Sequence, residues 1–168
     1  MTAGRSNTIN NQDWCTPPRY IKSIYDVLGY ISLDPCSNKH SMLQAEREIL
    51  LPEDGLCVEW DYPTIYVNPP YGKSSTSIWA KKCQQSWLDY CSEILLLVPV
   101  ATNTAYWKEC IFISSRGICF LSDTRLKFYL NGEEVIKGAP MACSMIYWGK
   151  NYKLFSSVFD EYGKCFMV

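Results

Sequence analysis

The stretch TIYVNPPY, residues 64–71, carries the most information about the fold of this chain. Its first four residues are β-branched or aromatic, which favours a strand. The two prolines end that strand because they cannot donate backbone hydrogen bonds. The apolar run at 93–98 has no polar alternation, as expected of a strand buried on both faces. With a helix predicted at 77–91, strands alternate with helices, which predicts an α/β sheet covered on both faces.

Further elements extend this pattern towards both ends of the chain. Apolar residues at helical spacing predict a helix at 19–28, opened by Pro17 or Pro18 and ended by Gly29. Additional strands are predicted at 30–33, 117–121, 125–130 and 142–148, and additional helices at 104–110 and, as a helix or an ordered loop with a helical turn, at 41–50. The strands near the C-terminus are expected to be antiparallel additions to the sheet.

Length and composition indicate one globular domain. The chain has 168 residues, of which 48% are hydrophobic, and this is enough to bury a core. No apolar run approaches the roughly 20 residues of a membrane span. Residues 1–12 are polar and lack the apolar centre of a signal peptide. We therefore expect a flexible lead-in at 1–12, a compact domain at 13–168, and a soluble cytoplasmic protein that binds no membrane.

Nine cysteines and a single histidine, His40, raise the question of a metal site. No two cysteines lie two or three residues apart, so the paired spacing of a zinc site is missing. An odd count without a secretion signal favours reduced thiols over disulfides. We therefore predict thiols and no metal. The formal net charge is −1, so any basic surface for a nucleic acid must be local.

Residues 68–71 have the chemistry of a site for a planar amino group. Pro69 and Pro70 stiffen the loop, which can hold the Asn68 side-chain carbonyl beside the Pro69 backbone carbonyl. Two such acceptors suit an amino group with two hydrogens, and Tyr71 offers a flat face on which a base can stack. The alternative is a proline-rich turn whose asparagine caps backbone groups. We favour the site because ligands in open α/β sheets bind beyond the carboxyl ends of strands.

Several short motifs occur in an order that resembles a known family. They are Trp14-Cys15-Thr16-Pro17, Leu33-Asp34-Pro35-Cys36, Asp54-Gly55-Leu56 with Trp60, Val67–Gly72, Leu96–Val100 and Arg125–Phe128. Together they resemble the phage-type DNA N-6-adenine methyltransferase (Dam-like) family. The resemblance implies a Rossmann-like methyltransferase fold, S-adenosylmethionine as the cofactor and double-stranded DNA as the partner. It also implies a location in the bacterial host cytoplasm if the protein is phage-encoded.

The same resemblance implies a set of cofactor-binding residues. These are Thr16, Pro17, Asp34, Pro35, Cys36, Asp54 and Asn68. Asp34 matches the acidic position of the cofactor motif, Thr16 lies in an element near the methionine end, and Asp54 is a candidate for the adenosine part. Two alternatives stay open, namely Asp34 as a strand terminator and Thr16 as a helix N-cap. The segment after Asp34 departs from the usual pattern because it lacks a glycine for close backbone approach.

The reaction implied by the resemblance begins with an adenine that leaves the duplex, because its 6-amino nitrogen is engaged in pairing. Asn68, Pro69, Pro70 and Tyr71 are the expected catalytic residues. Tyr71 stacks on the base, while Asn68 and Pro69 hold the amino hydrogens as the nitrogen attacks the methyl group. No strong base is required, so positioning is the main contribution.

DNA contacts are expected from polar and basic residues near the active-site loop and near the C-terminus. The candidates are Lys73, Ser75, Lys81, Arg125 and Lys127, with an ordinary solvent-facing surface as the alternative. No separate block is long enough to recognise a DNA sequence, so specificity comes from short loops or a partner subunit, or is low. Two other functions stay open: an amino-methyltransferase for protein glutamine or RNA, and a silent cofactor- or DNA-binding module.

Overall fold

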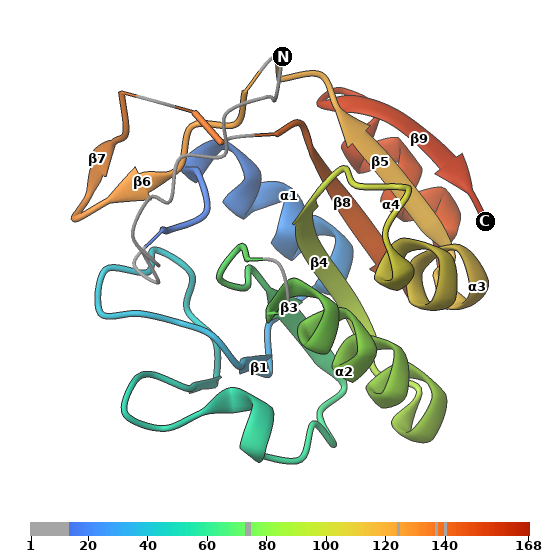
Figure 1. Ribbon diagram of the computed structural model, residues 1–168, viewed down its shortest axis with the longest axis horizontal. Helices are drawn as coiled ribbons and strands as arrows, with labels where there is room; N and C mark the ends of the chain where they lie inside the picture. Colours follow the sequence, from blue (N-terminus) through green and yellow to red (C-terminus); the bar gives the residue numbers. More distant parts are fainter. Residues whose placement is uncertain (1–13, 73–74, 124, 137, 140) are drawn as a thin grey trace.

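The computed structural model describes residues 14–168 except 73, 74, 124, 137 and 140. The predicted lead-in at 1–12 and the candidate Lys73 lie outside the described residues. A seven-stranded mixed sheet forms the centre, in the order β2-β1-β3-β4-β8-β5-β9 (Figure 1). The strands are β1 Leu33–Asp34, β2 Arg47–Glu48, β3 Thr64–Val67, β4 Glu93–Pro99, β5 Gly117–Leu121, β8 Cys143–Trp148 and β9 Gly163–Met167.

The sheet has a parallel half and an antiparallel half. β2, β1, β3 and β4 pair in parallel, whereas β8 is antiparallel to both β4 and β5, and β9 is antiparallel to β5. The predicted α/β sheet with antiparallel additions towards the C-terminus is therefore confirmed.

Helices cover both faces of the sheet (Figure 1). One face carries α1 (Pro18–Leu28) and α4 (Tyr152–Phe159), and the other carries α2 (Ser75–Tyr90), the π-helix η2 (Trp107–Ile111) and α3 (Phe112–Ser114). The remaining elements are the 3₁₀ helix η1 (Gly55–Cys57) and a separate hairpin of β6 (Tyr129–Leu130) and β7 (Glu133–Glu134).

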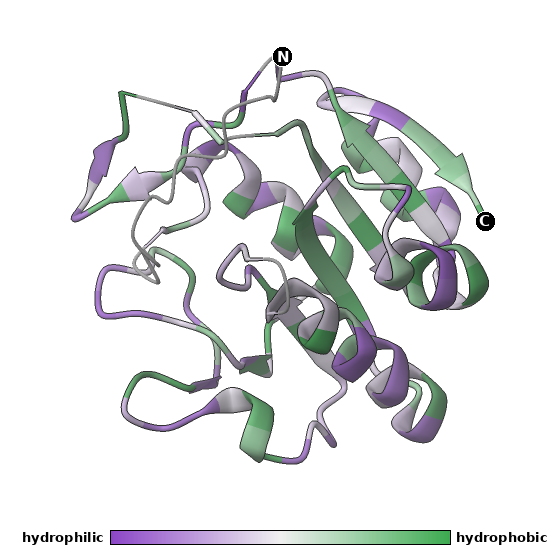
Figure 2. Cartoon of the chain, in the orientation of Figure 1, coloured by the Kyte–Doolittle hydropathy of each residue, from purple (hydrophilic) through white to green (hydrophobic). Residues whose placement is uncertain are grey.

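Strand β4 shows why the sequence at the centre of the sheet is apolar throughout. Leu95 and Leu97 pack in the core beneath α1, whereas Ile94, Leu96 and Val98 pack in the core beneath α2. Successive side chains of a strand point to opposite faces, so a strand covered on both faces needs apolar residues at every position. Figure 2 shows the result, with hydrophobic strands between helices whose outer faces are hydrophilic.

The segment 41–50, predicted as a helix or as an ordered loop with a helical turn, is an ordered loop without a helical turn. This segment is extended, and part of it forms β2 at the edge of the sheet. Glu46 N donates to Ile31 O, and Ile49 N donates to Asp34 O, each at 2.9 Å. Backbone pairing with the β1 segment therefore outweighs the helix propensity of the glutamate, glutamine and alanine residues here.

Three other elements differ from prediction by more than two residues at one end. The strand expected at 30–33 pairs as β1 at Leu33–Asp34, and the strand expected at 125–130 pairs only as β6. The helix expected at 104–110 continues to Ser114 and contains the π-helix η2. α4 and β9 have no counterpart among the predicted elements.

Candidate active site

The strand order creates a crevice at one end of the parallel half. β1 pairs with β2 on one side and with β3 on the other, so the loops that leave β1 and β3 run in different directions. Ligands of open α/β sheets bind at such a point, outside the carboxyl ends of the strands. Residues 35–36 and 68–71 follow these two strands directly.

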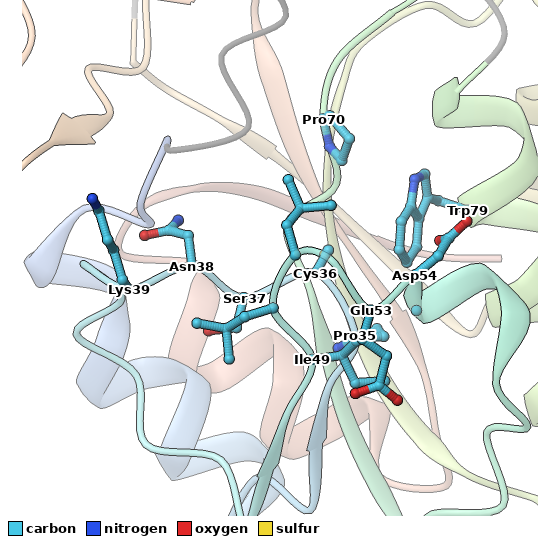
Figure 3. A pocket seen from close by; sticks show the side chains of 13 residues that line it. Pro35, Cys36, Ser37, Asn38, Lys39, Ile49, Glu53, Asp54, Pro70 and Trp79 are labelled. Atoms are coloured by element: carbon cyan, nitrogen blue, oxygen red, sulfur yellow. The ribbon is translucent and has the colours of Figure 1, made fainter.

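A cavity of about 210 Å³ lies at this crevice (Figure 3). Its lining comes from the loop after β1, from residues between Ile49 and Gly55, and from Pro70 and Trp79. Of the predicted cofactor-binding residues, the lining includes Pro35, Cys36 and Asp54. Pro70 brings the Asn-Pro-Pro-Tyr tetrad (residues 68–71) to the edge of the cavity.

The predicted residues Thr16 and Pro17 are buried and are not part of the cavity lining. The Thr16 hydroxyl forms a hydrogen bond of 2.7 Å with the Tyr66 hydroxyl, which ties the N-terminal segment to β3. The N-cap of α1 is Pro17, without a side-chain capping bond. The alternative assignment of Thr16 as a helix cap is therefore wrong.

Asp34 lies at the end of β1 and is 4% exposed. Its carboxylate accepts a hydrogen bond of 3.1 Å from Cys36 N, which orders the turn whose residues line the cavity. Burial raises the pKa of Asp34 to about 7, against the opposing effect of the bond from Cys36. Asp34 therefore shapes the cavity from outside its lining.

The glycine that is missing after β1 is supplied by another segment. Gly55 packs so closely on the β1 loop that a Cβ there would lie 1.8 Å from Pro35 O. The turn that presents it is fixed by Asp54, which accepts from Leu56 N at 2.9 Å, and by Trp60, whose indole N–H donates to Gly55 O at 2.9 Å. Close backbone approach therefore joins two walls of the cavity.

Three parts of the chain hold the tetrad in place. Asn68 Nδ2 donates to the Trp14 carbonyl at 2.9 Å, and Ser75 Oγ at the start of α2 donates to the Pro70 carbonyl at 2.9 Å. The Tyr71 hydroxyl donates to Leu97 O of β4 at 3.2 Å. Burial raises the pKa of Tyr71 well above its ordinary value, so the phenol stays protonated and remains a donor.

Two aromatic residues contact Tyr71, and no role was predicted for either of them. The Tyr71 ring lies edge-on to Trp14 and to Phe128, with centroids 6.4 Å and 5.5 Å away. Trp14 and Phe128 stack on each other at 5.1 Å. Phe128 precedes the hairpin, and Cys15 and Tyr129 exchange backbone hydrogen bonds of 2.8 Å and 3.1 Å. The N-terminal segment, the tetrad and the hairpin therefore form one packed unit.

Residues 5–164 match the family described as DNA N-6-adenine-methyltransferase (Dam). The chain belongs to this family. No curated protein matches it. Membership of the Dam family supports DNA adenine methyltransferase activity, and the mixed sheet with helices on both faces is consistent with a methyltransferase-like fold.

The residues predicted to contact DNA in this Dam-family chain do not lie on one surface. Lys81 is exposed on α2. Burial raises the pKa of the Cys110 thiol on η2, and the nearby Lys81 ammonium partly opposes this rise. Arg125 and Lys127 are exposed on the opposite side of the sheet, next to the hairpin. Ser75 is bonded to the tetrad. Among the four candidates that the structure describes, therefore, only Arg125 and Lys127 are exposed on the same side of the sheet.

Three general features complete the description of the Dam-family domain. Six of the nine cysteine side chains are buried. Within the described ranges, no group of three or more histidine, cysteine, aspartate or glutamate side chains is arranged to hold a metal ion. Across those same residues, every helix is too short or too polar to cross a membrane.

Proposed function

We propose that this chain transfers a methyl group from S-adenosylmethionine to the 6-amino nitrogen of an adenine that is flipped out of duplex DNA. The observation that carries the proposal is the hydrogen bond from Asn68 Nδ2 to the Trp14 carbonyl. This bond orients the amide, because its nitrogen must face Trp14. The carbonyl oxygen Oδ1 is then the end of the amide that accepts from a substrate amino group.

The neighbouring residues support the same role. Pro69 contributes a second carbonyl, and the fixed φ angles of the two prolines keep the acceptors in place. Ser75 holds the loop through the Pro70 carbonyl. A loop fastened in this way can orient the amino nitrogen without reorganising, and orientation is the largest contribution that a site without a strong base can make.

The cavity fits S-adenosylmethionine by the chemistry of its lining. Figure 3 shows Lys39 at one end and Asp54 with Trp79 at the other. A basic and an acidic side chain suit the charged groups of the ligand, and Trp79 offers an apolar wall for its base. Ser37 Oγ is buried in this lining, near enough to the Asp34 carboxylate to oppose the rise of its pKa. When bound, the cofactor supplies a methyl group on a positively charged sulfur.

In this proposal, some of the predicted cofactor residues line the cavity, and others lie outside its lining. Pro35, Cys36 and Asp54 line the cavity and contact the cofactor. Asp34 positions Cys36 through the turn after β1, and Thr16 fastens the N-terminal segment to β3.

The test is methyl transfer from radiolabelled cofactor to unmethylated duplex DNA, followed by digestion to nucleosides and identification of the labelled product. We expect the label in N-6-methyladenine. Label in protein or RNA but not in DNA would favour an amino-methyltransferase with another substrate. Cofactor and DNA binding without transfer to any acceptor would favour a silent binding module.

A further inference from the structure

The loop after β7 presents an exposed apolar side chain, Ile136, and a chain of contacts joins this loop to Tyr71 of the proposed active site. We propose that Ile136 on this loop inserts into the duplex next to the target adenine and fills the space that the flipped base leaves. This inference rests on the proposed function, and it assigns the part of the enzyme that stabilises the flipped state of the DNA.

Ile136 is 95% exposed, which is the highest value among the large hydrophobic side chains in the described part of the chain. Single exposed apolar residues are ordinary on protein surfaces, so exposure alone assigns no role. Ile113 on α3, for example, is 71% exposed and lies on the opposite side of the sheet from the hairpin. The position of Ile136 is what distinguishes it.

A short chain of contacts joins Ile136 to the tetrad. The preceding residue, Val135, is partly buried against the core, and its N–H donates to Phe128 O at 2.9 Å. The Phe128 ring lies against Tyr71, with centroids 5.5 Å apart. Ile136 is therefore the first residue of the loop that leaves the packed unit around Tyr71, and Figure 1 shows the hairpin projecting from the body of the molecule.

The loop that carries Ile136 is anchored where it rejoins the core. Arg125 Nη1 donates to Ala139 O at 3.1 Å, and Ala139 N donates to Leu126 O at 2.6 Å. A Cβ at Gly138 would lie 2.5 Å from the Cβ of Arg125, so the backbone there packs directly on the Arg125 side chain. Backbone hydrogen bonds at Val135 and Ala139 therefore flank Ile136 on both sides and tie this segment to the core.

The same unit fixes the loop relative to Asn68. Cys15 pairs with Tyr129 through two backbone hydrogen bonds, and the Trp14 carbonyl holds the Asn68 amide. Ile136, inserted in the DNA duplex, and Asn68, the acceptor for the extruded base, must stay at a constant distance from each other. The Cys15–Tyr129 pairing supplies that coupling.

The described strands of the hairpin carry charges of both signs. Lys127 pairs with Glu134 at 2.9 Å, and Glu133 is exposed at the turn. These two glutamates offset the positive charge of Lys127, so the wedge adds an apolar contact that phosphate binding by the hairpin strands does not supply. An apolar wedge offsets the cost of unstacking a base step, as other DNA-bending proteins show with isoleucine, leucine and methionine side chains.

The experiment compares Ile136→Ala with the wild type on two duplexes that differ only opposite the target adenine, once that adenine has been mapped. In one duplex the adenine is paired with thymine, and in the other it faces an abasic site and is already unpaired. We expect the variant to lose about tenfold or more in kcat/KM on the paired duplex and about twofold or less on the unpaired one, because unpairing removes most of the cost of flipping.

Two further variants and one fluorescence measurement make the outcome specific. Ile136→Leu should retain activity on both duplexes, and Ile113→Ala should match the wild type on both. With 2-aminopurine at the target position, the wild type should raise the fluorescence, and Ile136→Ala should not. Equal loss on both duplexes, or no loss on the paired one, overturns the wedge. A wild type that methylates adenine in neither duplex contradicts the proposed function instead.

Discussion

Aromatic side chains have different roles in the parallel and the antiparallel halves of the sheet. In the antiparallel half, Tyr147 and Phe155 stack with centroids 4.9 Å apart, and both are fully buried. In the parallel half, Tyr71 and Trp14 are only partly buried and lie at the end of β3. The first pair stabilises the fold, whereas the second lies at the proposed site.

The two halves also differ in how they use asparagine. Asn151 caps α4 by accepting from Leu154 N at 3.1 Å, so its carbonyl serves the helix. Asn68 instead donates from its amide nitrogen to Trp14, which leaves its carbonyl to serve the substrate. The comparison shows that diverging loops at the ends of parallel strands expose acceptors that a helix cap would consume.

Phe155→Ala should have the largest effect on stability. The ring is fully buried between Tyr147 and Phe159, so its removal leaves a cavity and should lower the free energy of unfolding by about 3–5 kcal/mol. Denaturant unfolding measures this change. Methyl transfer per folded molecule should stay unchanged, and its loss in a folded variant would show that the antiparallel half takes part in the site.

Asn68→Ala should lower turnover by about 10²–10³-fold, in line with the removal of one preorganised partner at an active site. Its stability should fall by only about 1 kcal/mol, because one hydrogen bond is lost. The matched control is Asn151→Ala, which should cost about 1 kcal/mol through the lost helix cap and leave turnover unchanged. Normal turnover by Asn68→Ala would remove Asn68 from the catalytic residues.

Asp34→Asn should change the pH dependence of stability. Because folding raises the pKa of Asp34 to about 7, the folded protein keeps a proton that the unfolded chain releases above about pH 4. Stability from this group is therefore present at low pH and lost as pH rises towards 7, by roughly 2–4 kcal/mol. Denaturant unfolding at pH 5 and at pH 8 measures this change. Between these two pH values, the free energy of unfolding should fall less in the variant than in the wild type.

Gly55→Ala should weaken cofactor binding by about tenfold or more, because its Cβ would meet Pro35 O at 1.8 Å and displace the loop that lines the cavity. Isothermal titration measures the affinity. Gly29→Ala is the matched control, since Gly29 has a φ of +75° but no atom within 4 Å of the added Cβ. The control should cost about 1 kcal/mol of stability and leave cofactor affinity unchanged; equal affinities in both variants would contradict the role of Gly55.

Helix α4 was not predicted, although the sequence contains a signal for it. α4 follows Asn151, an ordinary N-cap residue, and Phe155 and Phe159 lie four residues apart on its buried face. The helix expected at 41–50 shows the opposite case. Its residues favour a helix locally, and only pairing with the β1 segment makes the region extended.

Features that depend only on neighbouring residues could be predicted from the amino-acid sequence. Strand β3 and its stop at Pro69, the apolar β4 and the place of Asn68 after a strand follow from local propensity and from the missing N–H of proline. Tertiary structure decided which segments meet at that place. Trp14 bonds to Asn68, Gly55 packs on Pro35, and Phe128 contacts Tyr71, and each pair lies between 20 and 57 positions apart in the sequence. No local pattern encodes such contacts, because they arise only when the sheet has assembled and its loops diverge.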